Sequence, residues 1–140
     1  MECVILRFFL FLSSFVLCGV GLGCGADVYE FRSEDRPEYK NTVSVGELAA
    51  LQESGEVTIV DVRLFEDYEA DPVLIAGAKY KDPEMISGWS NTLRKDRPVV
   101  AYCVKGKWVS QKAATFLKDK GFEVYSLEGG IEAWKENNAE

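Results

Sequence analysis

Histidine is absent from the 140 residues of this chain. A catalytic cysteine–histidine pair and a histidine-rich metal site are therefore excluded. Positive charge is also scarce, because 16 lysines and arginines stand against 23 aspartates and glutamates, which leaves a formal net charge of −7. Such an acidic chain is a poor partner for nucleic acid. Any nucleophile in the sequence must be activated by backbone amides or by the few local lysines.

Cysteine is scarce beyond the N-terminal region. Cys3, Cys18 and Cys24 lie within the first 26 residues, and Cys103 is the only cysteine that follows. A lone thiol cannot form an internal disulfide, and in an exported protein it indicates reactivity or pairing with another molecule. The alternative is a buried, inert thiol. The polar, glycine-containing sequence after Cys103 argues against that alternative.

Long hydrophobic runs are missing except at the N-terminus, where residues 4–24 form an apolar stretch broken only by Arg7 and two serines. Small residues end this stretch and polar sequence follows, which is the layout of an export signal. Residues 1–26 are therefore predicted to be a signal peptide or an N-terminal membrane anchor, with Cys24 as a candidate lipid-bearing cysteine. Either arrangement predicts an exported bacterial protein, periplasmic or membrane-tethered.

The rest of the chain is predicted to be a linker and one α/β domain. Residues 27–42 carry runs of charge and one proline with little periodicity, as expected of a linker. Mostly apolar or β-branched runs predict strands at 57–62, 99–102 and 123–127. Helical patterns alternate with these strands, and the first begins with a capping box at Ser44. For residues 43–140 we expect a mostly parallel central sheet with helices on both faces.

Cys103 stands out because it follows the strand at 99–102 and precedes an amphipathic helix. Ligands of parallel sheets bind beyond the carboxyl ends of the strands, where Asp61 also lies. Ser110 is expected to cap the helix, so that the first free amides of the helix stabilise a Cys103 thiolate. The loop is a candidate anion-binding site, and its residues are Val104, Lys105, Gly106, Lys107, Trp108 and Val109.

Several segments resemble one family. They are Asp61-Val62-Arg63, Ile75-Ala76-Gly77-Ala78, Tyr102-Cys103-Val104-Lys105-Gly106, Ala113-Ala114, Gly121-Phe122 and Leu127-Glu128-Gly129-Gly130-Ile131-Glu132-Ala133-Trp134. In order and spacing, residues 43–136 resemble a single-domain rhodanese-like sulfurtransferase, which implies a three-layer sandwich. The resemblance implies that Cys103 takes up sulfane sulfur as a persulfide and passes it to a thiophilic acceptor, without a metal or another cofactor.

The resemblance also implies roles for the residues around the cysteine. The loop of residues 104–109 would cradle the transferred sulfur and the anionic donor. Asp61 and Arg63 resemble a buried structural pair behind this loop, which Ser110 would also support. The alternative for Arg63 is a direct role in orienting the donor.

Three functions are open on the sequence. The first is a thiosulfate-type sulfurtransferase that acts on a small sulfur-containing anion and a thiol or cyanide-like acceptor. The second is a sulfur carrier or regulatory module that holds a persulfide for an unidentified partner protein. The third is oxyanion reduction of the arsenate type, or phosphate ester hydrolysis, and it depends on a loop that counts one residue longer than in many family members. Phosphatase chemistry is disfavoured because Val109 stands where a C-x5-R loop requires arginine.

Overall fold

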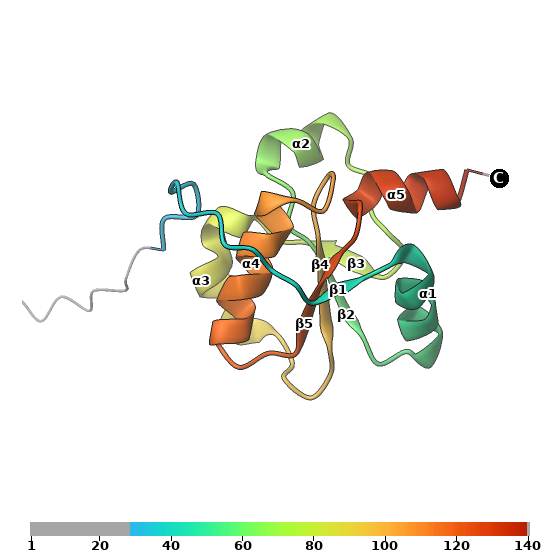
Figure 1. Ribbon diagram of the computed structural model, residues 1–140, viewed down its shortest axis with the longest axis horizontal. Helices are drawn as coiled ribbons and strands as arrows, with labels where there is room; N and C mark the ends of the chain where they lie inside the picture. The colour runs from blue at the N-terminus through green and yellow to red at the C-terminus, as the bar shows by residue number, and fades with distance from the viewer. Residues whose placement is uncertain (1–28, 140) are drawn as a thin grey trace, which may run out of the picture.

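The structure is a computed structural model that describes residues 29–139. Its centre is a five-stranded sheet in which every pairing is parallel, with the strand order β1-β5-β4-β2-β3 (Figure 1). The strands are β1 (Thr42–Val43), β2 (Thr58–Asp61), β3 (Ala78–Tyr80), β4 (Val99–Tyr102) and β5 (Val124–Leu127). The edge strands β1 and β3 are not among the predicted strands, because runs of two and three residues carry no readable period.

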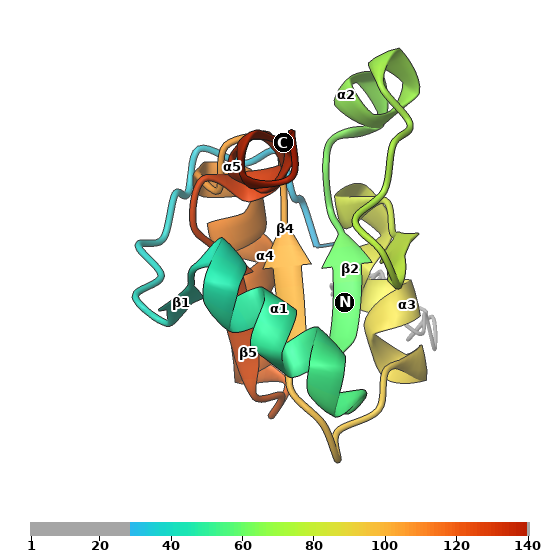
Figure 2. The same ribbon diagram turned by 90° about the vertical axis from the view of Figure 1, so that its right-hand side faces the viewer.

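Helices cover both faces of this sheet. The helices of the described residues are α1 (Val45–Ser54), α2 (Phe65–Ala70), α3 (Ile86–Trp89) between the 3-10 turns η1 (Pro83–Met85) and η2 (Ser90–Thr92), α4 (Trp108–Asp119) and α5 (Gly130–Asn137). Helices α1 and α5 pack on one face, and α3 and α4 pack on the other (Figure 2). The predicted three-layer α/β architecture is therefore confirmed. Among residues 29–139, no helix has the length and apolar character needed to cross a membrane.

The central strands supply two hydrophobic cores. Successive side chains of a strand point to opposite faces, so Val60 packs with Leu117 of α4 whereas Ile59 packs with Leu48 of α1. All four residues of β4 are fully buried. This burial explains the uninterrupted apolar run that predicted the strand, since both of its faces are covered. β4 therefore carries the residue that follows it, Cys103, at the end of a central, fully buried strand.

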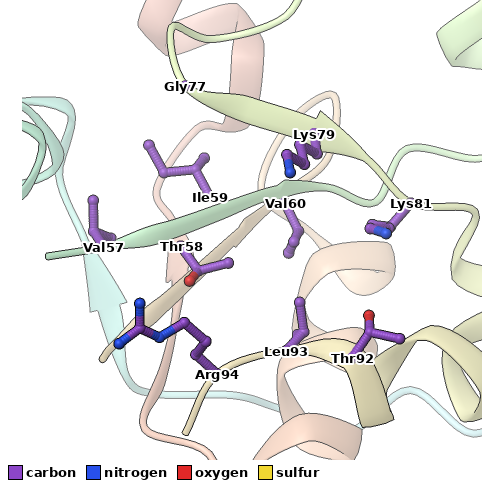
Figure 3. A pocket seen from close by; sticks show the side chains of 10 residues that line it. All are labelled: Val57, Thr58, Ile59, Val60, Gly77, Lys79, Lys81, Thr92, Leu93 and Arg94. Carbon is purple, nitrogen blue, oxygen red and sulfur yellow. The ribbon is translucent and has the colours of Figure 1, made fainter. Parts of the chain in front are cut away.

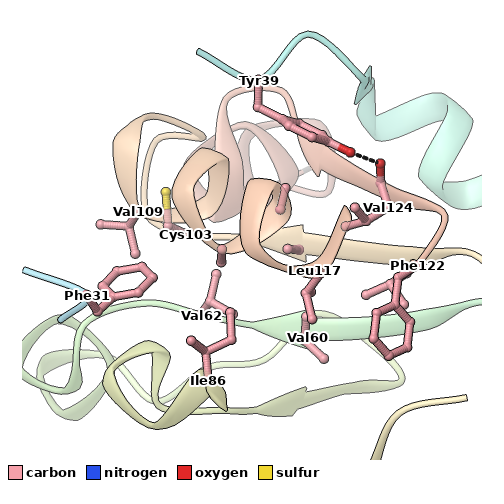
Figure 4. Packing of buried hydrophobic residues seen from close by; sticks show 14 residues of the cluster. Phe31, Tyr39, Val60, Val62, Ile86, Cys103, Val109, Leu117, Phe122 and Val124 are labelled. Atoms are coloured by element: carbon pink, nitrogen blue, oxygen red, sulfur yellow. Dashed lines mark hydrogen bonds between the residues drawn. The ribbon is translucent and has the colours of Figure 1, made fainter. Parts of the chain in front are cut away.

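The segment predicted to be a linker packs against the domain. Phe31 and Tyr39 are buried, and the Tyr39 hydroxyl donates to the Val124 carbonyl at 2.5 Å (Figure 4). The linker prediction is therefore wrong for the described residues of this segment. A segment that packs without forming a helix or strand shows no hydrophobic period, and charge runs surround its aromatic residues. We call residues 29–36 the N-terminal strap. The predicted signal or anchor, residues 1–26, lies outside the described residues.

Candidate active site

Cys103 and Asp61 lie at the ends of neighbouring strands. Cys103 directly follows β4, and Asp61 is the last residue of β2. The two strands are in register, with Asp61 beside Tyr102. Because parallel strands run in the same direction, both residues reach the carboxyl edge of the sheet, where such folds bind their ligands.

Helix α5 holds the start of the loop that follows Cys103. The Ile131 amide donates to the Cys103 carbonyl at 2.9 Å, and the Glu132 amide donates to the Val104 carbonyl at 3.1 Å. In a trans peptide the N–H points opposite to the C=O. The amides of Val104 and Lys105 therefore point away from α5, whereas the carbonyls of Cys103 and Val104 point toward it.

Two glycines allow the loop and α5 to approach each other backbone to backbone. Gly106 has a φ of 65° and Gly130 a φ of 60°, in the left-handed region. A Cβ on Gly130 would lie 2.4 Å from the Cys103 carbonyl oxygen, and one on Gly106 would lie 2.4 Å from the Leu127 carbonyl oxygen. Both contacts are impossible, so any side chain at either position would displace the loop.

The loop presents a row of free backbone amides. Within residues 29–139, no acceptor is found for the amides of residues 104–110, and the first hydrogen bond of α4 runs from Gln111 to the Lys107 carbonyl at 3.1 Å. Unpaired amides at the start of a helix attract negative charge through their dipoles. The loop can therefore bind an anion beside Cys103 without help from an arginine.

Ser110 contacts the sulfur directly and does not cap the helix. Helix α4 begins at Trp108 with Lys107 as its N-cap, which makes no side-chain cap, so the capping prediction is wrong. Ser110 is buried in the first turn, where its Oγ accepts from Cys103 Sγ at 3.3 Å and lies 2.9 Å from Ser126 Oγ. If the thiol ionises, the same hydroxyl can donate to the thiolate. Ser110 thus acts on the cysteine itself.

The earlier start of α4 also changes the loop. Only residues 104–107 separate Cys103 from the helix, because Trp108 and Val109 already belong to its first turn. The loop predicted from the sequence is therefore too long at its C-terminal end. Lys107 is a poor capping residue, so the sequence contains no signal for this boundary.

Cys103 borders a cavity of about 250 Å³. The other lining residues are Leu64, Asp67, Val104, Lys105, Lys107, Trp108 and Val109. Five of the six predicted loop residues therefore line it, and Gly106 instead faces α5. Two exposed lysines and the carboxylate of Asp67 supply its charges. Sequence reasoning missed Leu64 and Asp67, although both follow closely after the strand end at Asp61.

The thiol is more buried than the polar loop sequence predicts. Cys103 is 5% exposed and packs in the core with Phe31, Val62 and Val109 (Figure 4). The inference from loop polarity was therefore wrong about burial, because the strap and α4 cover the side chain. A thiol that is buried yet borders a cavity is shielded from bulk solvent while small molecules can still reach it.

Asp61 and Arg63 form a buried ion pair at the carboxyl edge of the sheet. They are 0% and 2% exposed, and Arg63 Nη2 donates to Asp61 Oδ2 at 2.6 Å while Nε donates to Oδ1 at 3.0 Å. Arg63 also donates to the carbonyls of Asp71 at 2.8 Å and Val73 at 2.9 Å. Burial alone would lower the pKa of Arg63, but the hydrogen bonds and charge of Asp61 outweigh it and raise the pKa. The guanidinium therefore donates to the Asp61 carboxylate and to two backbone carbonyls of the protein itself. This favours a structural role for Arg63 over direct binding of the sulfur donor.

Comparison with known proteins decides the family. The family model described as a rhodanese-like domain matches residues 44–137. The chain belongs to the rhodanese-like family. It is 38% identical over 98 residues to the thiosulfate sulfurtransferase GlpE of Shewanella oneidensis, an alignment that covers 69% of this chain and 94% of that protein.

Two solved structures share the fold of this chain. A rhodanese-like domain protein of Staphylococcus aureus superposes with a TM-score of 0.59 at 31% identity and covers 68% of this chain and 91% of its own. A protein of Rhodopseudomonas palustris described as a possible tyrosine phosphatase superposes with a TM-score of 0.62 at 29% identity, over 70% of this chain and 81% of its own.

A second cavity of this rhodanese-like domain lies along β2 and β3 and has a volume of about 330 Å³ (Figure 3). Its lining contains three positively charged residues, Lys79, Lys81 and Arg94. It contains no cysteine. Lysines on an edge strand such as β3 prevent unwanted strand pairing. Within residues 29–139, no group of acidic or cysteine side chains is arranged to hold a metal ion. The cavity at Cys103 is therefore the candidate active site.

Proposed function

We propose that the protein is a sulfurtransferase that takes sulfane sulfur from thiosulfate, or a similar donor, onto Cys103 and transfers it to a thiophilic acceptor. The observation that carries the proposal is a single thiol beside a row of unpaired amides, in a domain of the rhodanese-like family. The relative from Shewanella oneidensis, named a thiosulfate sulfurtransferase, supports the choice of donor.

The reaction has two displacement steps. The Cys103 thiolate, having lost its proton to solvent, attacks the outer sulfur of thiosulfate, and a sulfur–sulfur bond forms on the cysteine. The sulfur–sulfur bond of thiosulfate breaks, and sulfite leaves with the bonding electron pair. An acceptor such as cyanide or a thiolate then attacks the terminal sulfur of the persulfide, and the Cys103 thiolate leaves.

The loop stabilises the charges that move in these steps. Free amides of residues 104–110 can bind the oxyanion of the donor and the terminal sulfur of the persulfide. Lys105 and Lys107 provide positive charge at the cavity of a chain whose net charge is −7, which would otherwise repel anions. The Ser110 hydroxyl can donate to Cys103 Sγ whenever the sulfur is anionic.

Mass spectrometry tests this function directly. Thiosulfate should add about 32 Da, the mass of one sulfur atom, to the protein. Cyanide should then remove the added mass and yield thiocyanate, whereas Cys103→Ser should do neither. A wild-type protein with a free, titratable thiol that gains no mass and forms no thiocyanate would rule out the proposal.

A sulfur carrier that turns over poorly alone is the second candidate, and the burial of the thiol favours it. With Cys103 only 5% exposed, a bulky acceptor reaches the terminal sulfur with difficulty. Stoichiometric loading followed by a single turnover would support the carrier. Many turnovers with a small acceptor would support the enzyme.

Oxyanion reduction of the arsenate type or hydrolysis of phosphate esters is the remaining candidate, and the likeness to the possible tyrosine phosphatase favours only the hydrolysis. Val109 occupies the C-x5-R position, and the cavity lining contains no arginine. Aryl phosphate cleavage that disappears in Cys103→Ser would be needed to support it.

We also propose that the protein is exported or membrane-tethered through residues 1–26. The apolar stretch and the small residues that end it support this. Mass spectrometry of protein recovered from its host would identify a cleaved N-terminus, a lipid on Cys24 or an intact anchor. A full-length protein in the soluble cytoplasmic fraction would contradict the proposal.

A further inference from the structure

The N-terminal strap connects the two sides of the Cys103 cavity. On the α2 side, which contributes Leu64 and Asp67 to the lining, Arg32 Nη2 donates to Glu66 at 2.8 Å. Arg32 Nε also donates to Glu84 of η1 at 2.6 Å. One strap residue therefore ties the segment to η1 and to α2, and α2 carries the lining residue Asp67.

On the α4 side, a buried lysine holds the strap. Lys112 is 1% exposed, and its Nζ donates to Ser33 Oγ at 2.6 Å, to the Ser33 carbonyl at 3.3 Å and to the Asp35 carbonyl at 3.0 Å. Phe31 is 2% exposed and lies with its ring 5.9 Å from that of Trp108. A buried ammonium with three acceptors and a buried aromatic ring fix the strap in one position.

Arg36, the last residue of the strap, stacks on a residue that lines the cavity. Its guanidinium carbon is 3.9 Å from the ring centre of Trp108, whose side chain lines the cavity. Arg36 Nη1 also donates to the carbonyls of Ser33 and Asp35. These bonds orient the planar guanidinium, which is permanently charged and suited to stacking on an indole.

We propose that Arg36 is a specificity-determining residue of the active site, which fixes Trp108 as a cavity wall and adds positive charge that favours strongly anionic sulfur donors. The inference rests on the proposed function for its substrate class. The strap precedes residue 44, where the match to the rhodanese-like domain begins, so Arg36 lies outside the matched domain. Asp67, which lines the cavity, carries the opposite charge, so the local charge balance is sensitive to the loss of one cation.

Alkylation of Cys103 in the full chain measures this charge without relying on sulfur transfer. Iodoacetate is an anion and iodoacetamide is neutral, so the ratio of their rates reports the potential at the thiol. Arg36→Ala should lower this ratio roughly fivefold, and Arg36→Lys should keep most of it. Arg94→Ala, which removes an equal charge from an exposed pair with Asp96, should leave the ratio unchanged. High salt should weaken the effect of Arg36→Ala.

Kinetics with thiosulfate complete the test. Arg36→Ala should raise the KM for this dianion roughly fivefold with little change in kcat, and Arg36→Lys should largely restore it. An unchanged alkylation ratio in Arg36→Ala, or an equal fall in Arg94→Ala, would overturn the inference. If the ratio falls but the wild type forms no persulfide, the role of Arg36 toward anions stands and the sulfurtransferase function fails. Should Arg36→Ala not fold, Arg36→Gln, which removes the charge but keeps most of the side-chain volume, takes its place in the same comparison with Arg36→Lys.

Discussion

The segments that follow β2 and β4 occupy the same edge of the sheet but differ in how their polar groups are satisfied. After β2, Arg63 donates to Asp61 and to two backbone carbonyls, so its charge is fully paired inside the protein. After β4, the amides of residues 104–110 have no acceptor within residues 29–139. A position at the carboxyl edge therefore does not by itself make a site. The unpaired donors around Cys103 do.

The two segments also differ in what they contribute energetically. A buried ion pair stabilises the fold only while both partners are present, because each alone is a desolvated charge. The free amides beside Cys103 give up internal hydrogen bonds, and α5 and two glycines hold them in place before a ligand arrives. Such preorganised dipoles stabilise charge that develops during a reaction. The β2 segment is built for stability and the β4 segment for chemistry.

The largest expected effect is the loss of stability in Arg63→Ala. This change leaves the Asp61 carboxylate buried and unpaired and frees the carbonyls of Asp71 and Val73. We expect the free energy of unfolding to fall by about 3–5 kcal/mol, as measured by urea denaturation. The amount of sulfur that each folded molecule takes up from thiosulfate should fall only slightly.

A double variant separates the lost charge pair from other damage. Asp61→Leu combined with Arg63→Met removes both charges, and it should recover a substantial part of the stability that Arg63→Ala loses. If Arg63→Ala unfolds at the same urea concentration as the wild type, the pair is not structural and the contrast between the two segments fails.

A smaller effect is expected at the sulfur in Ser110→Ala. The hydroxyl lies 3.3 Å from Cys103 Sγ, and its loss removes the only side-chain hydrogen bond to the sulfur among the described residues. Such a bond to a charged group is worth about 1.5–3 kcal/mol, so iodoacetamide should alkylate Cys103 roughly tenfold more slowly at neutral pH.

Thr115→Ala is the matched control for this change. Thr115 lies on the same helix, and its hydroxyl donates to the Gln111 carbonyl at 2.9 Å. It should leave the alkylation rate unchanged. Equal alkylation rates for Ser110→Ala and the wild type would remove Ser110 from the site.

The sequence predicts most of the fold and the centre of the site. Strands β2, β4 and β5 could be recognised because buried parallel strands are apolar along their length, and Cys103 because it follows one of them. The start of α4 could not be predicted, since Lys107 carries no capping signal. Asp67 was missed because its place in the cavity depends on how α2 folds back over the strand end.

The N-terminal strap shows the same limit more strongly. Its main anchor joins Lys112 to Ser33, which lie 79 residues apart in the sequence. Local patterns contain no trace of such a contact, and the charges that surround Phe31 are typical of a linker. Its relation to the cavity depends on the packing of the strap against α4, which arises only in the folded protein.

The smallest expected effects come from two tyrosines, which test whether an unpaired polar group away from the loop is simply a cost. The buried Tyr80 hydroxyl has no partner among the described residues, whereas the Tyr102 hydroxyl accepts from the Ile75 amide at 3.2 Å. Tyr80→Phe should therefore stabilise the protein by about 0.5–1 kcal/mol, and Tyr102→Phe should destabilise it by about 1–2 kcal/mol.

Burial, with the charges of Asp82 and Asp61, raises the pKa of Tyr80 to about 12. Between about pH 10 and 12 the native state keeps this proton while the unfolded chain releases it, so wild-type stability falls with rising pH. Denaturation across this range should show the advantage of Tyr80→Phe growing with pH, and a loss of stability in Tyr80→Phe at neutral pH would show that its hydroxyl is satisfied after all.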